Sequence, residues 1–222
     1  MSDPYTPDIG TWAEQKYRLV SNYAAMFSTS MRGKWKELVY IDLFAGAGMA
    51  RIRETNRIVP TSPLLAMDVP NPFDRYVLCD KDEECVDALR RRVQDRHPEV
   101  DARYLLGDSN SNVGSVLAEL PLQHPRERSL SFCMVDPFRI RNFAFNTIES
   151  IASEIAVDFL VLIPSHMDAH REQVLYSKDH HTSISRFVGS SDWRDRRFDE
   201  PGDFGTFVVQ EFGRSMERIG YI

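Results

Sequence analysis

The sequence predicts an α/β protein with a doubly wound, mostly parallel β-sheet and an N-terminal helix. Five apolar segments of strand length alternate with segments of helical periodicity along the 222-residue chain. This alternation is typical of parallel strands joined by crossover helices. Four of the five strand segments have an aspartate at or near their carboxyl end. In a parallel sheet, these strand ends lie along one edge, where ligands bind.

The segment 11–31 predicts an amphipathic helix. Its larger apolar residues recur at helical spacing and are Trp12, Leu19, Val20, Tyr23, Met26 and Phe27. We expect this stripe to pack into the core. Thr11 and Glu14 have the spacing of a capping box at the start of the helix, and Gly33 follows its end. We assign residues 1–36 to a helical extension and 37–222 to the main domain.

The remaining elements follow in order along the chain. Strands are expected at 38–44, 75–80, 102–108, 129–136 and 157–164, and helices at 62–69, 81–97, 111–120, 145–155 and 204–219. The polar connection 165–203 is long for a loop, which predicts a lid or a substrate-binding insertion. Many folds of this kind end in an antiparallel hairpin. Too few residues follow 219 to form one, so we expect the hairpin to be missing and the sequence to belong to a longer protein.

Composition and charge limit the possible functions. Hydrophobic content of 42% and charged content of 27% are typical of a globular protein. The apolar runs are too short to cross a membrane, and the N-terminus has no signal-peptide pattern. Three cysteines without a CxxC pair indicate a reducing compartment, so we expect a cytoplasmic protein. The net charge of −6 disfavours non-specific nucleic-acid binding, although a local basic patch remains possible.

The acids at the strand ends predict a cofactor site. Gly46 and Gly48 follow the first strand and allow close approach of a ligand to the backbone. Asp80 ends the second strand, where a dinucleotide fold places its ribose-binding acid. Asp108 ends the third strand and can accept a hydrogen bond from a purine amine. Asp42 can hold the turn or bind a ligand ammonium group.

The glycine spacing separates two cofactor classes. The stretch GAGMAR at 46–51 lacks the third glycine of GxGxxG, and the residues after it do not start a clean helix. A dinucleotide needs a helix N-terminus for its pyrophosphate, whereas S-adenosylmethionine has no pyrophosphate. The pattern therefore favours S-adenosylmethionine, and a nicotinamide-dependent dehydrogenase is the weaker alternative.

Several motifs together resemble one family. The stretch DLFAGAG resembles motif I of class I S-adenosylmethionine-dependent methyltransferases. The chain resembles, more narrowly, the bacterial three-Cys-motif partner proteins, through WAEQKYRLV, VYIDLFAGAGMARI, TSPLLAM, VLCDKD, GDSN, VDPF and RFVGSSDWR. The resemblance implies a Rossmann-like methyltransferase and association with a three-cysteine-motif protein, an iron–sulfur or radical enzyme. The cofactor residues assigned on this basis are Asp42, Phe44, Ala45, Gly46, Gly48, Asp80, Lys81, Asp108, Ser109 and Asp136.

The stretch VDPF defines the candidate catalytic residues Asp136, Pro137 and Phe138. Adenine amino-methyltransferases have (D/N)PP(Y/F) at this point, where the acid orients the target amine and the ring stacks on the base. This chain is one proline short, so the ring is expected at a different place. Methylation at cytosine C5 needs a cysteine nucleophile instead, but Cys133 lies inside the strand and is better explained as core packing.

Candidate substrate contacts are Arg51, Arg53, Arg139, Arg141 and His166, all next to strand ends. Arginines at such a rim can bind phosphate, although solvated loop charges are the alternative. Arg90, Arg91 and Arg92 are interpreted as a solvated helix face. His166 and His170 have a zinc-ligand spacing without the HExxH glutamate, so we expect no metal site. The hypothesis is methyl transfer to nucleic acid, and the alternative is an accessory subunit of the three-cysteine-motif enzyme.

Overall fold

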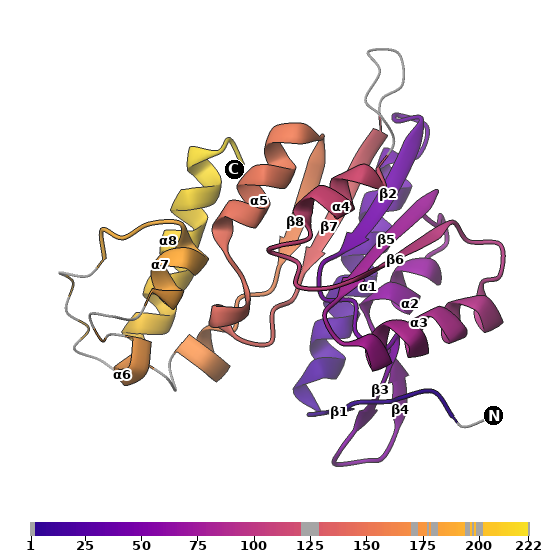
Figure 1. Ribbon diagram of the computed structural model, residues 1–222, viewed down its shortest axis with the longest axis horizontal. Coiled ribbons are helices and arrows are strands. Elements are labelled where there is room, and N and C mark those ends of the chain that lie inside the picture. The colour runs from indigo at the N-terminus through magenta and orange to yellow at the C-terminus, as the bar shows by residue number, and fades with distance from the viewer. Residues whose placement is uncertain are drawn as a thin grey trace. The chain divides into compact units, whose positions relative to one another are not determined.

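A five-stranded parallel sheet forms the centre of the fold in the computed structural model (Figure 1). Its strands, in spatial order, are β6 (Ala102–Leu106), β5 (Arg75–Asp80), β2 (Glu37–Asp42), β7 (Ser129–Val135) and β8 (Val157–Val161). The structure describes residues 3–120, 129–169, 173–176, 178, 182–193, 196, 198 and 202–221, without the side chains of 166 and 167. The predicted α/β class and the five predicted strands are confirmed.

The strand order puts β2 in the middle, between β5 and β7, both parallel to it. Renumbered along the large sheet alone, the order is 3-2-1-4-5, which is that of a doubly wound α/β fold. In this order, the chain leaves β2 toward β5 on one side and returns to β7 on the other. The loop after β2 therefore lies at the point of reversal, where doubly wound sheets bind their ligands.

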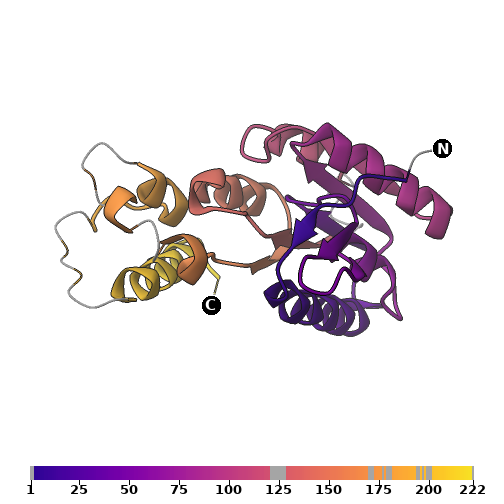
Figure 2. The same ribbon diagram turned by 90° about the horizontal axis from the view of Figure 1, so that it is seen from below.

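The chain divides into two compact units, one formed by Met1–Val135 with Ile155–Leu160 and the other by Asp136–Glu154 with Val161–Ile222. In the first unit, α1 (Trp12–Met31) covers one face of the sheet and α3 (Glu83–Arg96) the other (Figure 2). The helices α2 (Ser62–Met67) and α4 (Val113–Ala118) complete this unit. The assignment of residues 1–36 as a separate extension stays a prediction.

An aromatic cluster packs α1 against the sheet. The ring of Phe27 lies 5.2 Å from that of Phe132 on β7, and Tyr23 stacks on Phe132 at 5.4 Å. The ring of Tyr40 on β2 lies 5.7 Å from that of Phe132 and 5.4 Å from that of Phe73. These aromatic pairs add about 0.5–1.5 kcal/mol each beyond the area that they bury.

The predicted stripe on α1 is only half buried. Val20 and Phe27 are buried, but Trp12, Leu19 and Met26 are 47%, 62% and 59% exposed. The three exposed residues are seven apart, so they lie on one outer face of the helix. The expectation that they enter the core was wrong, because the small residues Ala13 and Ala24 occupy the buried face beside Val20 and Phe27.

The predicted capping box of α1 is also absent. Thr11 makes no side-chain cap bond within the part of the chain that the structure describes. Glu14 instead pairs with Arg57, with Oε1 at 2.9 Å from Nη1. The carboxylate therefore ties the helix to a distant hairpin and not to its own N-terminus.

A small second sheet, which the sequence analysis did not predict, follows the glycine loop. It contains β1 (Asp8–Ile9), β3 (Met49–Ile52) and β4 (Ile58–Pro60) in the order β1-β3-β4 (Figure 1). β1 pairs with β3 in parallel, and β3 pairs with β4 as a hairpin. The hairpin occupies the position where a dinucleotide fold begins its first helix, and α2 starts only after it at Ser62.

The second unit contains α5 (Phe145–Glu154), η1 (Ile140–Asn142), η2 (Ser165–Ala169), α6 (Gln173–Tyr176), α7 (Ser183–Val188) and α8 (Asp203–Arg218). Its core includes Phe145, Phe187 and Phe212. The ring centroid of Phe212 lies 5.3 Å from that of Phe145 and 5.2 Å from that of Phe187. The described parts of 165–203 are therefore partly helical and not a plain loop. Helix α7 buries Ile184, Phe187 and Val188, a pattern too short to stand out in the sequence.

Candidate functional site

Three aspartates at strand ends stabilise the turns that directly follow them. In each case, the carboxylate Oδ1 accepts a hydrogen bond from the backbone N–H two residues later. The three bonds are Phe44 N to Asp42 at 3.1 Å, Asp82 N to Asp80 at 3.0 Å, and Asn110 N to Asp108 at 2.9 Å. This is the Asx-turn, which lets a side chain replace a backbone partner at a strand end. Local turn formation therefore explains part of the acid pattern without any ligand.

Asp80 also connects the loops of three neighbouring strands. Its second oxygen, Oδ2, accepts a hydrogen bond from Gly46 N at 2.7 Å, and its backbone carbonyl accepts one from Gly107 N at 2.9 Å. Asp80 thus joins the glycine loop after β2 to the start of the loop after β6. Each carboxylate oxygen has two lone-pair positions, so each can accept a further bond, for example from a ribose hydroxyl.

The two loop glycines are required for different reasons. Gly46 has φ +60° and a Cβ at this position would meet no atom within 4 Å. Gly48 has φ +80° and its Cβ would lie 2.8 Å from Leu89 Cδ1 on α3. Gly48 therefore serves both backbone conformation and helix packing. Gly46 serves backbone conformation and leaves its surroundings open to approach.

Asp42 is fully buried, and both of its carboxylate oxygens accept hydrogen bonds from neighbouring groups. Its Oδ2 accepts a hydrogen bond from the Tyr40 hydroxyl at 3.1 Å, while Oδ1 binds Phe44 N. Burial, followed by the charge of Asp42, raises the pKa of Tyr40 well above its usual value, so Tyr40 remains a hydrogen-bond donor. Of the two roles proposed for Asp42, these bonds support holding the turn.

Ser109 has a buried hydroxyl with no partner in the described chain. The residue is 3% exposed and its Oγ makes no hydrogen bond to any described group. A buried hydroxyl without a bond costs about 1–3 kcal/mol, so such a group points to a missing partner. Asp108, the residue before it, is exposed. The pair therefore places one exposed carboxylate and one buried hydroxyl at the end of β6.

The remaining predicted cofactor residues of the first unit lie around the same loop. Ala45 is buried and its N–H binds Cys79 O at 2.9 Å, Phe44 is half-buried, and Lys81 is exposed at the start of the α3 turn. The polar groups of these loops suit S-adenosylmethionine: the Asp80 carboxylate as acceptor for the ribose, the Asp108 carboxylate and the Ser109 hydroxyl for the purine, and an open glycine at Gly46. No predicted cofactor residue of this unit is remote from the loops joined by Asp80.

Arg92 on α3 holds the N-terminal segment against the glycine loop. Its guanidinium donates to Ala47 O at 2.6 Å, Tyr5 O at 2.8 Å, Pro4 O at 3.1 Å and Thr6 Oγ1 at 2.6 Å. Burial lowers the pKa of Arg92 below its usual value. The interpretation of Arg92 as part of a solvated face was therefore wrong. An arginine amid two others on a helix gave no sequence signal for this role.

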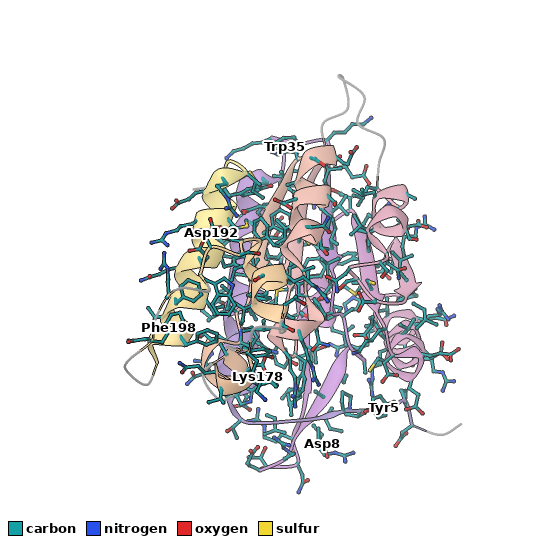
Figure 3. All side chains as sticks on the ribbon, turned by 60° about the vertical axis from the view of Figure 1, so that its left-hand side comes forward. Tyr5, Asp8, Trp35, Lys178, Asp192 and Phe198 are labelled. Atoms are coloured by element: carbon teal, nitrogen blue, oxygen red, sulfur yellow. The ribbon has the colours of Figure 1, made fainter. Side chains whose placement is uncertain are left out.

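Arg51 and Arg53 lie at β3, directly after the glycine loop. The Nη1 atom of Arg51 lies 3.8 Å from Oδ1 of Asp8, a residue of the N-terminal segment labelled with Tyr5 in Figure 3. Arg53 is exposed, and no carboxylate pairs with it among the residues that the structure describes. Local ion pairing thus accounts for Arg51, whereas Arg53 is a candidate phosphate contact.

The candidate catalytic residues begin the second unit, directly after β7. Asp136 is half-buried, Pro137 is buried and Phe138 is 79% exposed. The guanidinium of Arg139 lies 5.8 Å from the centroid of the Phe138 ring, and Arg141 is exposed. Phe138 and Arg139 together form an exposed ring with a cation beside it.

Asp168 holds the loop that contains Phe138. Its buried carboxylate Oδ2 accepts hydrogen bonds from Ile140 N and from the Tyr176 hydroxyl, both at 2.7 Å. Asp168 lies in the π-helical turn η2, which begins four residues after the end of β8, and such turns are frequent at functional sites. Asp168 was not among the predicted site residues. It is a structural anchor of the 136–140 loop.

Among the described residues, no group of three or more metal-ligating side chains is found, and no helix is long and apolar enough to cross a bilayer. His170 lies outside the described residues, as does the side chain of His166. The roles proposed for these two histidines stay predictions.

The three cysteines are buried thiols. Burial raises the pKa of Cys79 to about 11 and that of Cys85 to about 12, and raises that of Cys133 well above its usual value. Cys133 is 0% exposed inside β7. These values disfavour a thiolate nucleophile at neutral pH, so they argue against the cytosine C5 mechanism.

We expect the native thiols to react with Ellman's reagent at pH 8 about 100-fold more slowly than those of the urea-unfolded chain, because the thiolate fraction is far smaller. The pKa values of the three thiols are higher in the folded chain than in the unfolded chain. Their contribution to the free energy of unfolding is therefore complete below about pH 8.5 and decreases as the pH rises toward the folded pKa values. Urea unfolding at pH 7, 9 and 10 tests this sign. A cysteine that reacts immediately in the native protein at pH 7 would contradict the prediction.

Comparisons with known proteins identify similar structures but no family. No family model and no curated protein matches the chain. A Legionella pneumophila protein is 17% identical, with 61% of this chain and 63% of that chain covered and a TM-score of 0.43. A methyltransferase from Geobacter sulfurreducens is 18% identical, with coverages of 66% and 59% and a TM-score of 0.39. Magnesium protoporphyrin IX methyltransferase from Synechocystis, with bound S-adenosylmethionine, is 11% identical, with coverages of 77% and 66% and a TM-score of 0.38.

These similarities assign neither an activity nor a ligand to the chain. The matches span less than two thirds of the Legionella and Geobacter proteins, at 63% and 59% of their lengths. All three TM-scores are below 0.5, so the fold class rests on the chain's own strand order. The chain has a Rossmann-like α/β fold with an N-terminal helix and a five-stranded parallel sheet, and it is distantly similar in structure to S-adenosylmethionine-dependent methyltransferases.

Proposed function

We propose that this chain is an S-adenosylmethionine-dependent methyltransferase that acts on nucleic acid, and that it is related to the three-Cys-motif partner proteins. The observation that carries the proposal is the position of Asp80. Its carboxylate lies at the end of the strand next to β2 and binds the N–H of Gly46 at 2.7 Å. An acid here is the ribose-binding group of doubly wound nucleotide sites.

Each residue of the first unit has a role in this proposal. Asp80 accepts hydrogen bonds from the ribose hydroxyls, and Asp108 and Ser109 bind the polar edge of the purine. Gly46 gives the cofactor access to the backbone, and Asp42 maintains the turn beneath it. S-adenosylmethionine supplies an electrophilic methyl group on a sulfonium sulfur. The protein contributes mainly position and electrostatics to such an in-line displacement.

Asp136 orients the acceptor atom and accepts its proton after transfer. Its half-buried position directly after β7 supports this role, and the exposed ring of Phe138 supports stacking on an unpaired base. The guanidinium of Arg139, 5.8 Å from that ring, adds a positive charge suited to phosphate. Asp168 keeps this loop in place through its bond to Ile140 N.

Isothermal titration tests the cofactor first. We expect S-adenosylmethionine and S-adenosylhomocysteine to bind, and NAD not to bind, because the loop has no helix N-terminus for a pyrophosphate. Transfer of a labelled methyl group to total RNA, DNA or protein then identifies the substrate class. Absence of binding by both sulfur compounds overturns the proposal, and tight binding of NAD favours the dehydrogenase alternative.

An accessory role is the second candidate function. Phe138 and Val174 are 79% and 81% exposed in the second unit, which suits contact with another protein. The partner is a protein with a three-cysteine motif. Co-purification with such a protein, together with no methyl transfer to any substrate pool, supports this candidate over the enzyme.

A further inference from the structure

An exposed aromatic and basic cluster lies beside the glycine loop. We define the Trp12 surface by Trp12, Lys16 and Tyr17 of α1 together with Arg53 after β3. We propose that the Trp12 surface binds single-stranded nucleic acid, with a base stacked on Trp12 and a phosphate at Arg53. As a substrate contact the surface rests on the proposed function, but its binding can be measured without methyl transfer.

The aromatic part of the surface is organised by one lysine. The Nζ atom of Lys16 lies 4.9 Å from the ring centroid of Trp12 and 4.9 Å from that of Tyr17. Trp12 remains 47% exposed although Ala13, its neighbour on α1, is fully buried. The lysine thus lies against both rings, of which Trp12 is exposed and Tyr17 is half-buried. An exposed indole with an adjacent cation is a suitable platform for a base.

Gly10 brings Trp12 and Arg53 together. A Cβ at Gly10 would lie 2.9 Å from Trp12 Cδ1 and 3.6 Å from Arg53 Nη2. Both side chains thus approach the same point of the backbone. Arg53 N also binds Ile9 O at 3.0 Å, which holds the arginine beside the N-terminal segment. The guanidinium and the indole are therefore neighbours, although 41 positions separate them in the sequence.

The charges of this region favour a phosphate-bearing partner. Arg51 and Arg57 are each paired, with Asp8 at 3.8 Å and with Glu14 at 2.9 Å. Arg53 has no carboxylate partner among the described residues, and Lys16 contacts the two rings. Glu54, the residue after Arg53, is exposed and forms no ion pair with another described residue. Arg53 is therefore the arginine of this region that a phosphate can reach without displacing a carboxylate of the described residues.

Single-stranded nucleic acid fits better than duplex or membrane. Stacking needs an unpaired base, which a duplex does not present at its surface. A membrane anchor needs a continuous apolar face, whereas the exposed Gln15, Arg18 and Asn22 interrupt the exposed apolar residues of α1. The surface is also close in sequence to the cofactor loop, since Arg53 follows Gly48 by five residues.

Fluorescence anisotropy with labelled 12-nucleotide RNA and DNA tests the proposal. We expect Trp12→Ala and Arg53→Ala each to weaken binding about tenfold, since stacking and a phosphate contact are each of that order. Trp12→Phe keeps a ring and is expected to retain most of the affinity. Arg53→Ala is also expected to reduce the salt slope by about 0.7, the value for one phosphate on a single strand.

Matched control variants distinguish a specific effect of the Trp12 surface from a general effect of substitution on folding or charge. Leu19→Ala removes another exposed apolar residue of α1, and Arg90→Ala removes an exposed arginine on α3. Both are expected to bind like the wild type, and circular dichroism confirms folding of every variant. Equal binding by Trp12→Ala and wild type, or stronger binding to duplex or to anionic phosphatidylserine vesicles, overturns the proposal. If Trp12 matters for RNA or DNA binding but no methyl transfer occurs, only the proposed enzymatic function fails.

Discussion

Replacement of Asp80 by alanine is expected to weaken the binding of S-adenosylmethionine by about 100-fold or more, since two charge-assisted hydrogen bonds of about 1.5–3 kcal/mol each are lost. The change also leaves Gly46 N and Asp82 N without their acceptor. The glycine loop then loses the side-chain part of its connection to β5 and keeps the backbone bond from Ala45 N to Cys79 O, so a partial loss of order adds to the loss of contacts. Isothermal titration of the variant measures the effect.

Two further variants show whether a loss of affinity in Asp80→Ala is specific to this carboxylate. Asp80→Asn keeps one acceptor oxygen but no charge, so we expect an affinity between those of the alanine variant and the wild type. Asp87→Ala removes an exposed acid on α3 that pairs with Arg90, and it is expected to bind normally. A folded Asp80→Ala protein with wild-type affinity would show that the cofactor does not bind at this carboxylate.

Replacement of Arg92 by methionine is expected to lower the free energy of unfolding by about 2–4 kcal/mol, because several hydrogen bonds from one charged donor are lost together. The four acceptors are Pro4 O, Tyr5 O, Thr6 Oγ1 and Ala47 O. Methionine keeps much of the length of the side chain, so packing changes little. Urea unfolding measures the global effect.

Hydrogen exchange gives the local effect of the Arg92 variant. The amides of Arg51 and Arg53 bond to Pro7 O and Ile9 O, so they report on the N-terminal segment. We expect both to exchange faster in Arg92→Met. Arg91→Met, an exposed neighbour on the same helix, serves as the control and is expected to change neither stability nor exchange. Unchanged exchange in Arg92→Met would mean that the segment is held by β1 pairing alone.

The alternation of apolar segments was sufficient to predict the large sheet. Each strand from β2 to β8 in that sheet has its own apolar run, and each is followed by a helical pattern, so local periodicity and topology agree. The acid at Asp80 was predictable for the same reason, because strand ends share one edge. Its second bond, to Gly46 N, depends on the spatial order of strands, which periodicity does not encode.

The small sheet and the role of Arg92 were not predictable in this way. β1 has two residues and β4 has three, which is too short for alternation to be seen. Arg92 follows two other arginines, Arg90 and Arg91, in the sequence. It reaches Ala47 O because of the side of α3 on which it lies. The exposure of Trp12 likewise depends on which face of α1 meets the sheet. Periodicity identifies a stripe but does not determine how wide the buried part is.

The three Asx-turns have a consequence for how a ligand would be received. Asp42, Asp80 and Asp108 each fold the chain that follows them through a bond spanning two residues. The loops at the sheet edge therefore obtain their shape from adjacent residues, before any ligand contributes. A site prepared in this manner loses little conformational entropy when it is filled. Association should accordingly be fast and should leave the backbone at this edge almost unmoved.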